Sequence, residues 1–141
     1  MSWSNKYIQI PFIEKGRDFN GCDCWGLVRL VYEQELNIDL PSFLEYENTK
    51  DIRAISRMIR ENQFGDSWFK VTDPLPFDVL VFRMMGSVAH VGIVVKNGLM
   101  LHCQKNVNTA HEAYLLKSSD WVERLEGIYR HAKYSDRGIT V

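Results

Sequence analysis

The stretch Gly21-Cys22-Asp23-Cys24-Trp25-Gly26-Leu27 sets a cysteine directly in front of an amphipathic run. Apolar side chains follow at helical spacing, at Leu27, Val28, Val31 and Tyr32. This pattern predicts a helix that begins near Cys24. A cysteine at a helix N-terminus meets unpaired backbone N–H groups and the positive end of the helix dipole, which both favour the thiolate. We therefore expect Cys24 to be a nucleophile with a lowered pKa.

Two histidines far downstream are candidate bases. His90 opens the apolar run Ala89–Val95, and His102 lies in the run Leu99–Cys103. A helix-capping cysteine followed by histidines on strands is the arrangement of a cysteine peptidase, in which a neighbouring base activates the nucleophile.

The turn at Lys96-Asn97-Gly98 decides whether the two histidines share a face. A two-residue turn would pair Lys96 with Leu99 and put His90 and His102 on opposite faces, because side chains alternate along a strand. A three-residue loop with a left-handed Gly98 pairs Val95 with Leu99 and puts both histidines on one face. The alternating apolar residues agree with this second register.

Blocks along the chain resemble the NlpC/P60 family of cell-wall cysteine peptidases. The similarity runs from Pro11 to His102 through these blocks: Pro11-Phe12-Ile13, Asp23–Val28, Leu40-Pro41, Leu75–Phe82 and His90–Ile93. The resemblance implies a papain-like α+β fold in which an N-terminal helix carrying the cysteine packs on an antiparallel β-sheet. It also implies hydrolysis of peptide bonds in peptidoglycan stems, typically next to D-glutamate.

The same resemblance implies roles for individual residues. Cys24 is the nucleophile, His90 is the base, and His102 orients His90. Asp23 matches a position that helps to hold the free amine of the substrate, although an aspartate there also fits a simple helix cap. The oxyanion is expected to meet the backbone N–H of Cys24.

Two departures from the family pattern concern the substrate side of the site. Trp25 stands where the family usually has Ser, and the Cys-Trp-Gly-Leu-Val-Arg form resembles a branch found in tail proteins of long-tailed bacteriophages. Phe12 stands where many members have a Tyr whose hydroxyl touches the active site. The expected partners are therefore a peptidoglycan stem peptide and tail-tip or hub proteins of a virion. The alternative is a structural tail-tip subunit that retains the fold but cuts little.

Composition narrows the function classes. A chain of 141 residues fits one domain, expected over residues 1–133, with a loose polar tail at 134–141. Net charge is −1 without basic clusters, which argues against nucleic-acid binding. No stretch approaches the roughly 18 apolar residues that a membrane helix needs, so we expect no membrane insertion. The N-terminus lacks the apolar core of a secretion signal, so we expect synthesis in the host cytoplasm and delivery by a phage tail.

The remaining cysteines and histidines carry weaker signals. An odd count of cysteines favours reduced thiols, with Cys103 a buried apolar residue and Cys22 a loop residue or pocket wall. A Cys-x-Cys pair matches structural zinc spacing poorly, so we expect neither metal nor cofactor. His111 and His131 are expected to be surface or strand-end residues.

The remaining pattern predicts the order of elements. A helix over 24–36 is followed by a second one over about 49–61 and by loop or edge structure from Gln63 to Pro76. Strands are expected over 77–83, 89–95, 99–105, 112–116 and 127–131, with a turn or short helix at 118–121.

Overall fold

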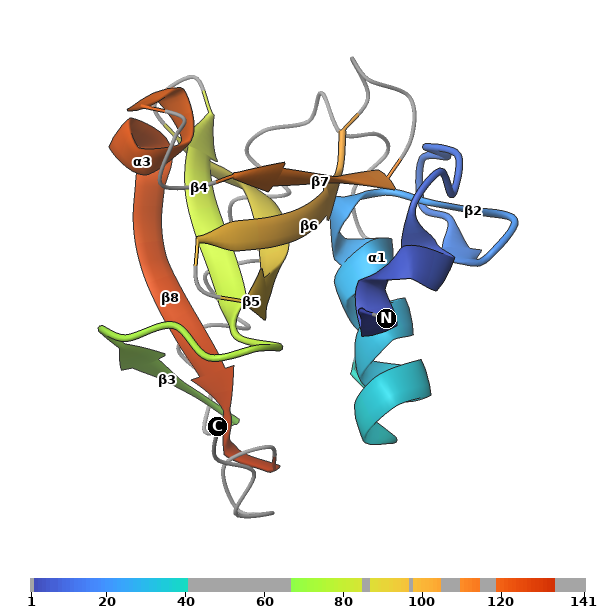
Figure 1. The fold of residues 1–141 in the computed structure, drawn as a ribbon, viewed down its shortest axis with the longest axis horizontal. Coiled ribbons are helices and arrows are strands. Elements are labelled where there is room, and N and C mark those ends of the chain that lie inside the picture. The colour runs from blue at the N-terminus through green and yellow to red at the C-terminus, as the bar shows by residue number, and fades with distance from the viewer. Residues whose placement is uncertain are drawn as a thin grey trace.

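A computed structural model describes residues 2–40, 67–84, 87–96, 98–104, 110–114 and 119–133 (Figure 1). The N-terminal part contains η1 (Trp3–Tyr7), the two-stranded sheet β1 (Arg17–Asp18) and β2 (Gly21–Cys22), the helix α1 (Cys24–Val31) and the π-helical turn η2 (Tyr32–Leu36). The rest consists of β3 (Trp68–Val71), β4 (Val79–Met84), β5 (Ser87–Lys96), β6 (Leu99–Cys103), β7 (Ala110–Tyr114), α3 (Ser119–Arg124) and β8 (Leu125–His131). This arrangement is the predicted α+β class.

The main sheet is antiparallel throughout its described part. Its strands lie in the order β3-β8-β4-β5-β6-β7, so the predicted strands all belong to one sheet. The predicted loop or edge region contains β3, which is indeed an edge strand. The second predicted helix over 49–61 and the tail at 134–141 lie outside the described residues.

The first helix begins at Cys24, as the sequence predicts, and it is continued by η2 up to Leu36. Asn37 ends it in the left-handed conformation with φ 54°, which an Asn tolerates at a helix C-terminus. Every residue of α1 except Arg29 is buried, because N-terminal residues such as Tyr7 and Ile10 cover the outer side of the helix.

Alternation along the strands divides the sheet into two faces. One face carries Val91, Ile93 and Leu101, which pack with α1 in the larger hydrophobic core. The other face carries four buried residues, Leu80, Phe82, Val94 and Met100, with Trp121 of α3 packed against them. Thus α1 and α3 lie on opposite sides of the sheet (Figure 1).

The hairpin between β5 and β6 combines the two registers that the sequence allows. Lys96 pairs with Leu99, so the predicted pairing of Val95 with Leu99 is wrong. Ile93 nevertheless pairs with Leu101, as predicted, because the register shifts at Val95 within the strand. Gly98 has the predicted left-handed φ of 82°. The extra residue that the sequence places in the loop is therefore a bulge in β5, and it restores His90 and His102 to one face.

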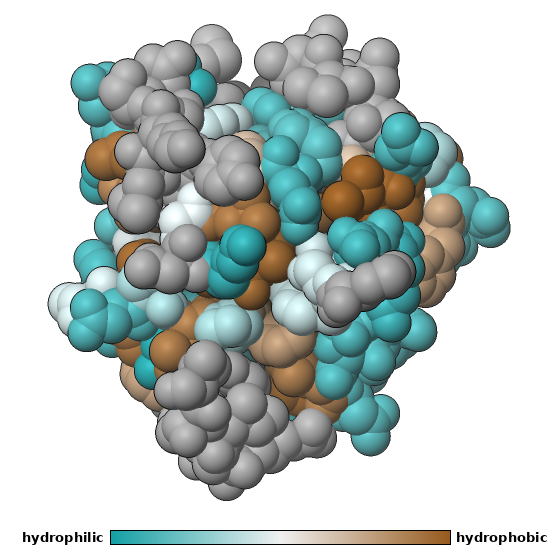
Figure 2. All heavy atoms as spheres, viewed as in Figure 1, coloured by the Kyte–Doolittle hydropathy of each residue, from teal (hydrophilic) through white to brown (hydrophobic). Residues whose placement is uncertain are grey.

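The surface mixes hydrophilic and hydrophobic residues on the face seen in Figure 2. Large hydrophobic side chains with substantial exposure are Ile13, Phe19, Phe69 and Val122. Within the described ranges, no helix is both long and apolar enough to span a bilayer.

Candidate active site

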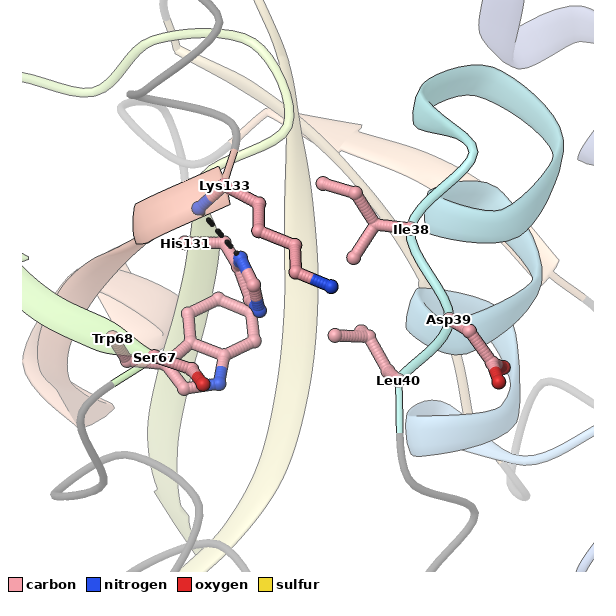
Figure 3. A pocket seen from close by; sticks show the side chains of 7 residues that line it. All are labelled: Ile38, Asp39, Leu40, Ser67, Trp68, His131 and Lys133. Carbon is pink, nitrogen blue, oxygen red and sulfur yellow. Dashed lines mark hydrogen bonds between the residues drawn. The ribbon is translucent and has the colours of Figure 1, made fainter.

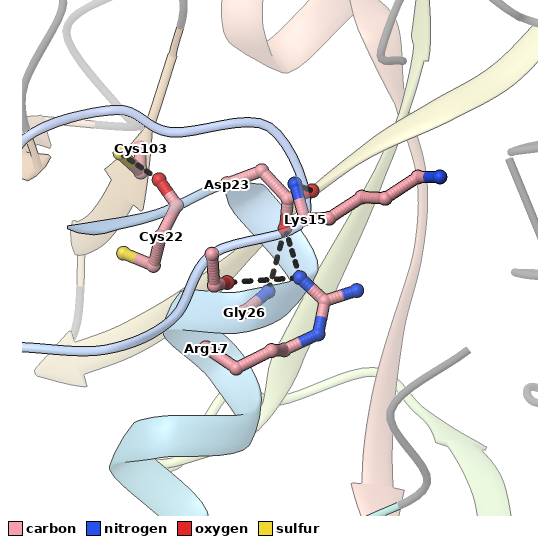
Figure 4. A network of polar contacts seen from close by, with 7 residues as sticks. Lys15, Arg17, Cys22, Asp23, Gly26 and Cys103 are labelled. Carbon is pink, nitrogen blue, oxygen red and sulfur yellow. Dashed lines mark hydrogen bonds and ion pairs between the residues drawn. The ribbon is translucent and has the colours of Figure 1, made fainter. Parts of the chain in front are cut away.

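A network of polar contacts fixes the start of α1. The Asp23 Oδ1 atom accepts a hydrogen bond from the Gly26 backbone N–H at 2.9 Å (Figure 4). The same oxygen forms an ion pair with Arg17 Nη1, also at 2.9 Å. The Lys15 backbone N–H donates to Asp23 Oδ2 at 3.0 Å. Asp23 is 1% exposed, so its carboxylate is both a helix cap and the buried partner of Arg17. The sequence left a simple helix cap as an alternative role for Asp23, and the structure shows that Asp23 caps α1.

Position 26, the glycine of the Cys-Trp-Gly motif, has no room for a side chain. A Cβ at Gly26 would collide with the backbone carbonyl oxygen of Gly16. The Arg17 guanidinium also donates to this carbonyl, at 2.9 Å. The segment before β1 can therefore lie directly against the helix start only because position 26 has no side chain.

The Cys24 thiol is buried, and its pKa moves in the direction opposite to the sequence-based expectation. Burial, followed by the negative charge of Asp23, raises the pKa of Cys24 to about 12. Backbone hydrogen bonds from Val91 and Trp25 lower it, but they do not outweigh the loss of water. Cys24 is therefore a neutral thiol in the resting protein.

The two sequence-predicted histidines contact each other. His90 Nε2 lies 2.9 Å from His102 Nδ1, and both rings are buried. Burial is the main cause that lowers the pKa of His90 to about 4 and that of His102 to about 2. Both imidazoles are therefore neutral at pH 7, and one ring donates a hydrogen bond to the other.

The thiol reaches the sheet next to His90. The pairing between β5 and β6 extends to Ile93 and Leu101, and Val91 lies beyond its end. The backbone of this Val91, the residue that follows His90, is one of the two backbone groups that lower the pKa of the Cys24 thiol. Between the described side chains of Cys24 and His90 there is no direct hydrogen bond, since the one side-chain hydrogen bond of His90 is to His102.

Aromatic rings surround the histidine pair on the sheet face that carries α3. Trp121 stacks on His90, with centroids 5.5 Å apart and planes at 29°, and meets the His102 ring edge-on at 4.9 Å. Phe82 packs against Trp121 at 5.0 Å. His111 is the cross-strand neighbour of His102 in β7, with ring centroids 4.4 Å apart.

Sequence reasoning missed the places of Trp121 and His111. His111 is the second residue of β7, close to the strand end that the sequence predicts, but it lies beside the site, and Trp121 covers the site. The alternation of β7 alone assigns no face to His111, because the face depends on the register between β6 and β7.

The residues predicted for the substrate side lie at the helix start and before it. Trp25 is 3% exposed and belongs to the larger core. Phe12 is partly buried and forms an isolated bridge with Cys22. Phe12 is therefore more accessible to a substrate than Trp25 is.

Cys22 and Cys103 are both fully buried free cysteines. The Cys103 thiol donates a hydrogen bond to the Cys22 carbonyl oxygen at 3.3 Å, and contact with Cys103 raises the pKa of Cys22 above its usual range. Cys103 is the buried residue that the sequence predicts, whereas Cys22 belongs to β2 and to the core instead of a loop. No group of three or more His, Cys, Asp or Glu within the described part of the chain could hold a metal ion.

A separate cavity of about 230 Å³ lies beyond the C-terminal end of η2 (Figure 3). It lies between residues 38–40 and the strands β3 and β8, and Trp68, His131 and Lys133 are among its lining residues. His131 is the last residue of β8, a strand end as expected, but it is buried, and its Nδ1 accepts a hydrogen bond from the Lys133 backbone N–H at 3.1 Å. This cavity is at the opposite end of the helical segment from Cys24.

Similar solved structures share the fold. The NlpC/P60 domain of the peptidoglycan hydrolase SagA matches with a TM-score of 0.62 at 20% identity, covering 90% of this chain and 92% of that one. An NlpC/P60 family protein from Bacillus cereus matches with a TM-score of 0.63 at 22% identity, covering 89% of this chain and 36% of that one. NlpC1 from Trichomonas vaginalis matches with a TM-score of 0.61 at 20% identity, covering 86% of this chain and 39% of that one. The chain thus spans less than half of the two longer relatives.

No curated protein matches the chain. The family model described as the NlpC/P60 family matches residues 9–130, a range that includes Cys24, His90 and His102. Helix, sheet and the position of the cysteine agree with the papain-like architecture of that family. The chain therefore belongs to the NlpC/P60 family.

Proposed function

We propose that this protein is a cysteine endopeptidase that hydrolyses peptidoglycan stem peptides. Cys24 is the nucleophile, His90 is the general base and His102 orients His90. The hydrogen bond between His90 Nε2 and His102 Nδ1 is the observation that carries the proposal. It occupies Nε2 of His90 and leaves the other ring nitrogen, Nδ1, as the one that acts as the base. Family membership and the fold shared with a peptidoglycan hydrolase support the choice of substrate.

The neutral resting pair sets the order of proton transfer. Because burial keeps Cys24 protonated and His90 unprotonated, the thiol proton moves to His90 Nδ1 as the sulfur attacks the scissile carbonyl. The backbone N–H of Cys24 at the helix start stabilises the oxyanion. His90 then protonates the leaving amine, and a water molecule activated by His90 hydrolyses the acyl-enzyme.

Digestion of defined stem peptides, followed by mass spectrometry of the products, tests the proposal. Wild-type protein is expected to release fragments whose masses identify the bond, and Cys24→Ala is expected to release none. Cys103→Ala is the matched cysteine control, because Cys103 lies in the core and has no assigned part in the reaction. Equal products from the wild type and Cys24→Ala would refute the nucleophile.

The second candidate is a structural subunit of a phage tail tip, in which the fold persists with little activity. The low exposure of Cys24, 7%, and its neutral thiol favour it. The Cys-Trp-Gly-Leu-Val-Arg form supports the tail context for both candidates. This candidate predicts no stem-peptide products, together with the presence of the chain in purified phage particles.

A further inference from the structure

The cavity shown in Figure 3 has no role in the proposed reaction, and we name it the distal cavity. Its walls come from residues 38–40 after η2, from residues 67 and 68 at the start of β3, and from residues 131 and 133 at the end of β8. Its volume of about 230 Å³ is below the roughly 300–1,000 Å³ of sites for drug-sized ligands. The distal cavity therefore has room for a molecule of fragment size.

The buried His131 supplies a hydrogen-bond donor at the distal cavity. Its Nδ1 accepts a hydrogen bond from the Lys133 backbone N–H at 3.1 Å, and burial lowers the pKa of the ring. The imidazole is therefore neutral at pH 7 and carries its proton on Nε2. Within the described part of the chain, His131 Nε2 has no hydrogen-bond partner. The rings of Trp68 and Tyr32, with centroids at 4.8 and 6.0 Å, hold the imidazole in place.

Lys133 adds a positive charge to the same cavity. Its side chain extends from the end of β8 toward Ile38, so that the ammonium lies between Ile38 and the His131 ring (Figure 3). Among the described residues, no carboxylate forms an ion pair with this ammonium. Asp39 is the one acidic residue of the lining, but its carboxylate points away from the cavity and pairs with Arg29 Nη2 at 3.3 Å. The polar part of the distal cavity therefore favours a negative charge.

The rest of the lining selects the kind of anion. Ile38, Leu40 and Trp68 are buried apolar side chains on the cavity walls, and they suit a ligand with an apolar body. A carboxylate has two oxygens, so one can pair with the Lys133 ammonium while the other accepts from His131 Nε2–H. Inorganic phosphate would match the charge but would leave the apolar walls without a partner.

We propose that the distal cavity binds a small organic carboxylate through Lys133 Nζ and His131 Nε2–H. The apolar part of this ligand packs against Ile38, Leu40 and Trp68. The size of the cavity favours a free acid over the terminal carboxylate of a peptide, which shares the same chemistry. The site is separate from the candidate active site, so the inference does not depend on peptidase activity.

Titration of the full chain with benzoate at pH 7, followed by nitrogen-15 NMR, tests the proposal. Benzoate is expected to cause saturable shifts at Trp68, His131 and Lys133, with a Kd of about 1–10 mM. The signals of Cys24 and His90 are expected to stay unchanged. Benzamide lacks the charge and inorganic phosphate lacks the apolar body, so both are expected to bind at least about fivefold more weakly.

Variants of the two polar groups locate the carboxylate. Lys133→Gln removes the charge of an exposed side chain and is expected to raise the Kd for benzoate about fivefold, whereas Lys133→Arg should keep it. His131→Phe removes the donor, retains a ring and is expected to weaken binding to a similar extent. Lys96→Gln, at the exposed end of β5 and outside the cavity, is the matched control and should leave the Kd unchanged.

The proposal is overturned if benzoate causes no saturable shift at the cavity, or if benzamide binds as tightly as benzoate. An unchanged Kd in folded Lys133→Gln would also overturn it. Tighter binding of acetyl-alanyl-phenylalanine than of benzoate would contradict the assignment to a free acid and indicate the C-terminus of a peptide. None of these measurements requires turnover, so their failure is distinct from failure of the proposed peptidase function.

Discussion

His90 and His102 join through a 2.9 Å contact between Nε2 and Nδ1, although they belong to different strands and the pairing of those strands stops short of His90. The contact is a side-chain bridge on the face that carries Trp121. It therefore orients His90 independently of the backbone ladder.

His102→Ala removes this bridge and is expected to lower kcat/KM for stem peptides by about 100-fold or more, because His90 loses its fixed tautomer. His102→Asn retains an amide oxygen that can accept from His90 Nε2–H, so its loss is expected to stay near tenfold. Steady-state kinetics of both variants check the difference. His131→Asn, at a buried histidine in β8, is the control and should leave kcat/KM close to the wild type. Equal losses in both His102 variants would mean that His102 acts through packing.

Alkylation of Cys24 by iodoacetamide is expected to be slow at pH 6 and to rise about tenfold per pH unit from pH 7 to 9. The reason is the sign of the pKa shift: burial raises the pKa of the thiol, so the thiolate fraction grows with pH over this whole range. Peptide mapping by mass spectrometry separates Cys24 from the fully buried Cys22 and Cys103. A rate that stays constant below pH 7 in wild type and falls there in His90→Ala would instead indicate a thiolate–imidazolium pair.

Trp121→Ala is expected to raise the pKa of His90 from about 4 toward the ordinary value of 6.5. Trp121 stacks on the His90 ring, and its removal admits water, which stabilises the protonated imidazole. An NMR titration of the His90 ring protons measures this shift. Val122→Ala, at an exposed neighbour on α3, is the matched control and should leave the titration unchanged. An unaltered His90 pKa in Trp121→Ala would show that other groups keep the ring dry.

Asp23→Asn is expected to destabilise the protein by about 1–2 kcal/mol in urea unfolding. The amide keeps a usable cap for Gly26, but the partly buried Arg17 loses this charged partner. Arg17→Gln in the same background should then cost less than it does in the wild type, since the pair is already broken. Additive losses would show that the two side chains do not interact.

The same variant tests whether Asp23 also binds a free substrate amine. Both carboxylate oxygens already accept hydrogen bonds, so an amine would have to share one of them. A loss of kcat/KM for free stem peptides that is absent for N-acetylated ones supports the amine contact. Equal effects on both peptides leave Asp23 with the cap and the ion pair alone.

The sequence by itself determined the elements whose causes are local. The start of α1 follows from Asp23 and the apolar spacing after Cys24, because a cap and a helical stripe act within a few residues. The apolar alternation of the two strands predicted that His90 and His102 share a face, but the structure reaches this arrangement through a bulge at Val95 and not through the expected three-residue loop. The family resemblance extends these local signals to the α+β fold that the structure shows.

Only the tertiary structure decided the bulge, the protonation states and the additional residues around the site. The bulge lies at Val95 instead of in the loop because packing on both faces of the sheet fixes the register of β5 against β6. The pKa of Cys24 rises although a helix start favours the thiolate, because desolvation depends on everything packed around the sulfur. Trp121 and His111 reach the histidine pair from α3 and β7, at sequence separations where no local pattern specifies contact. Local sequence sets the conformation of each element. The exclusion of water from a site, and the residues that contact it, depend on how distant elements pack together.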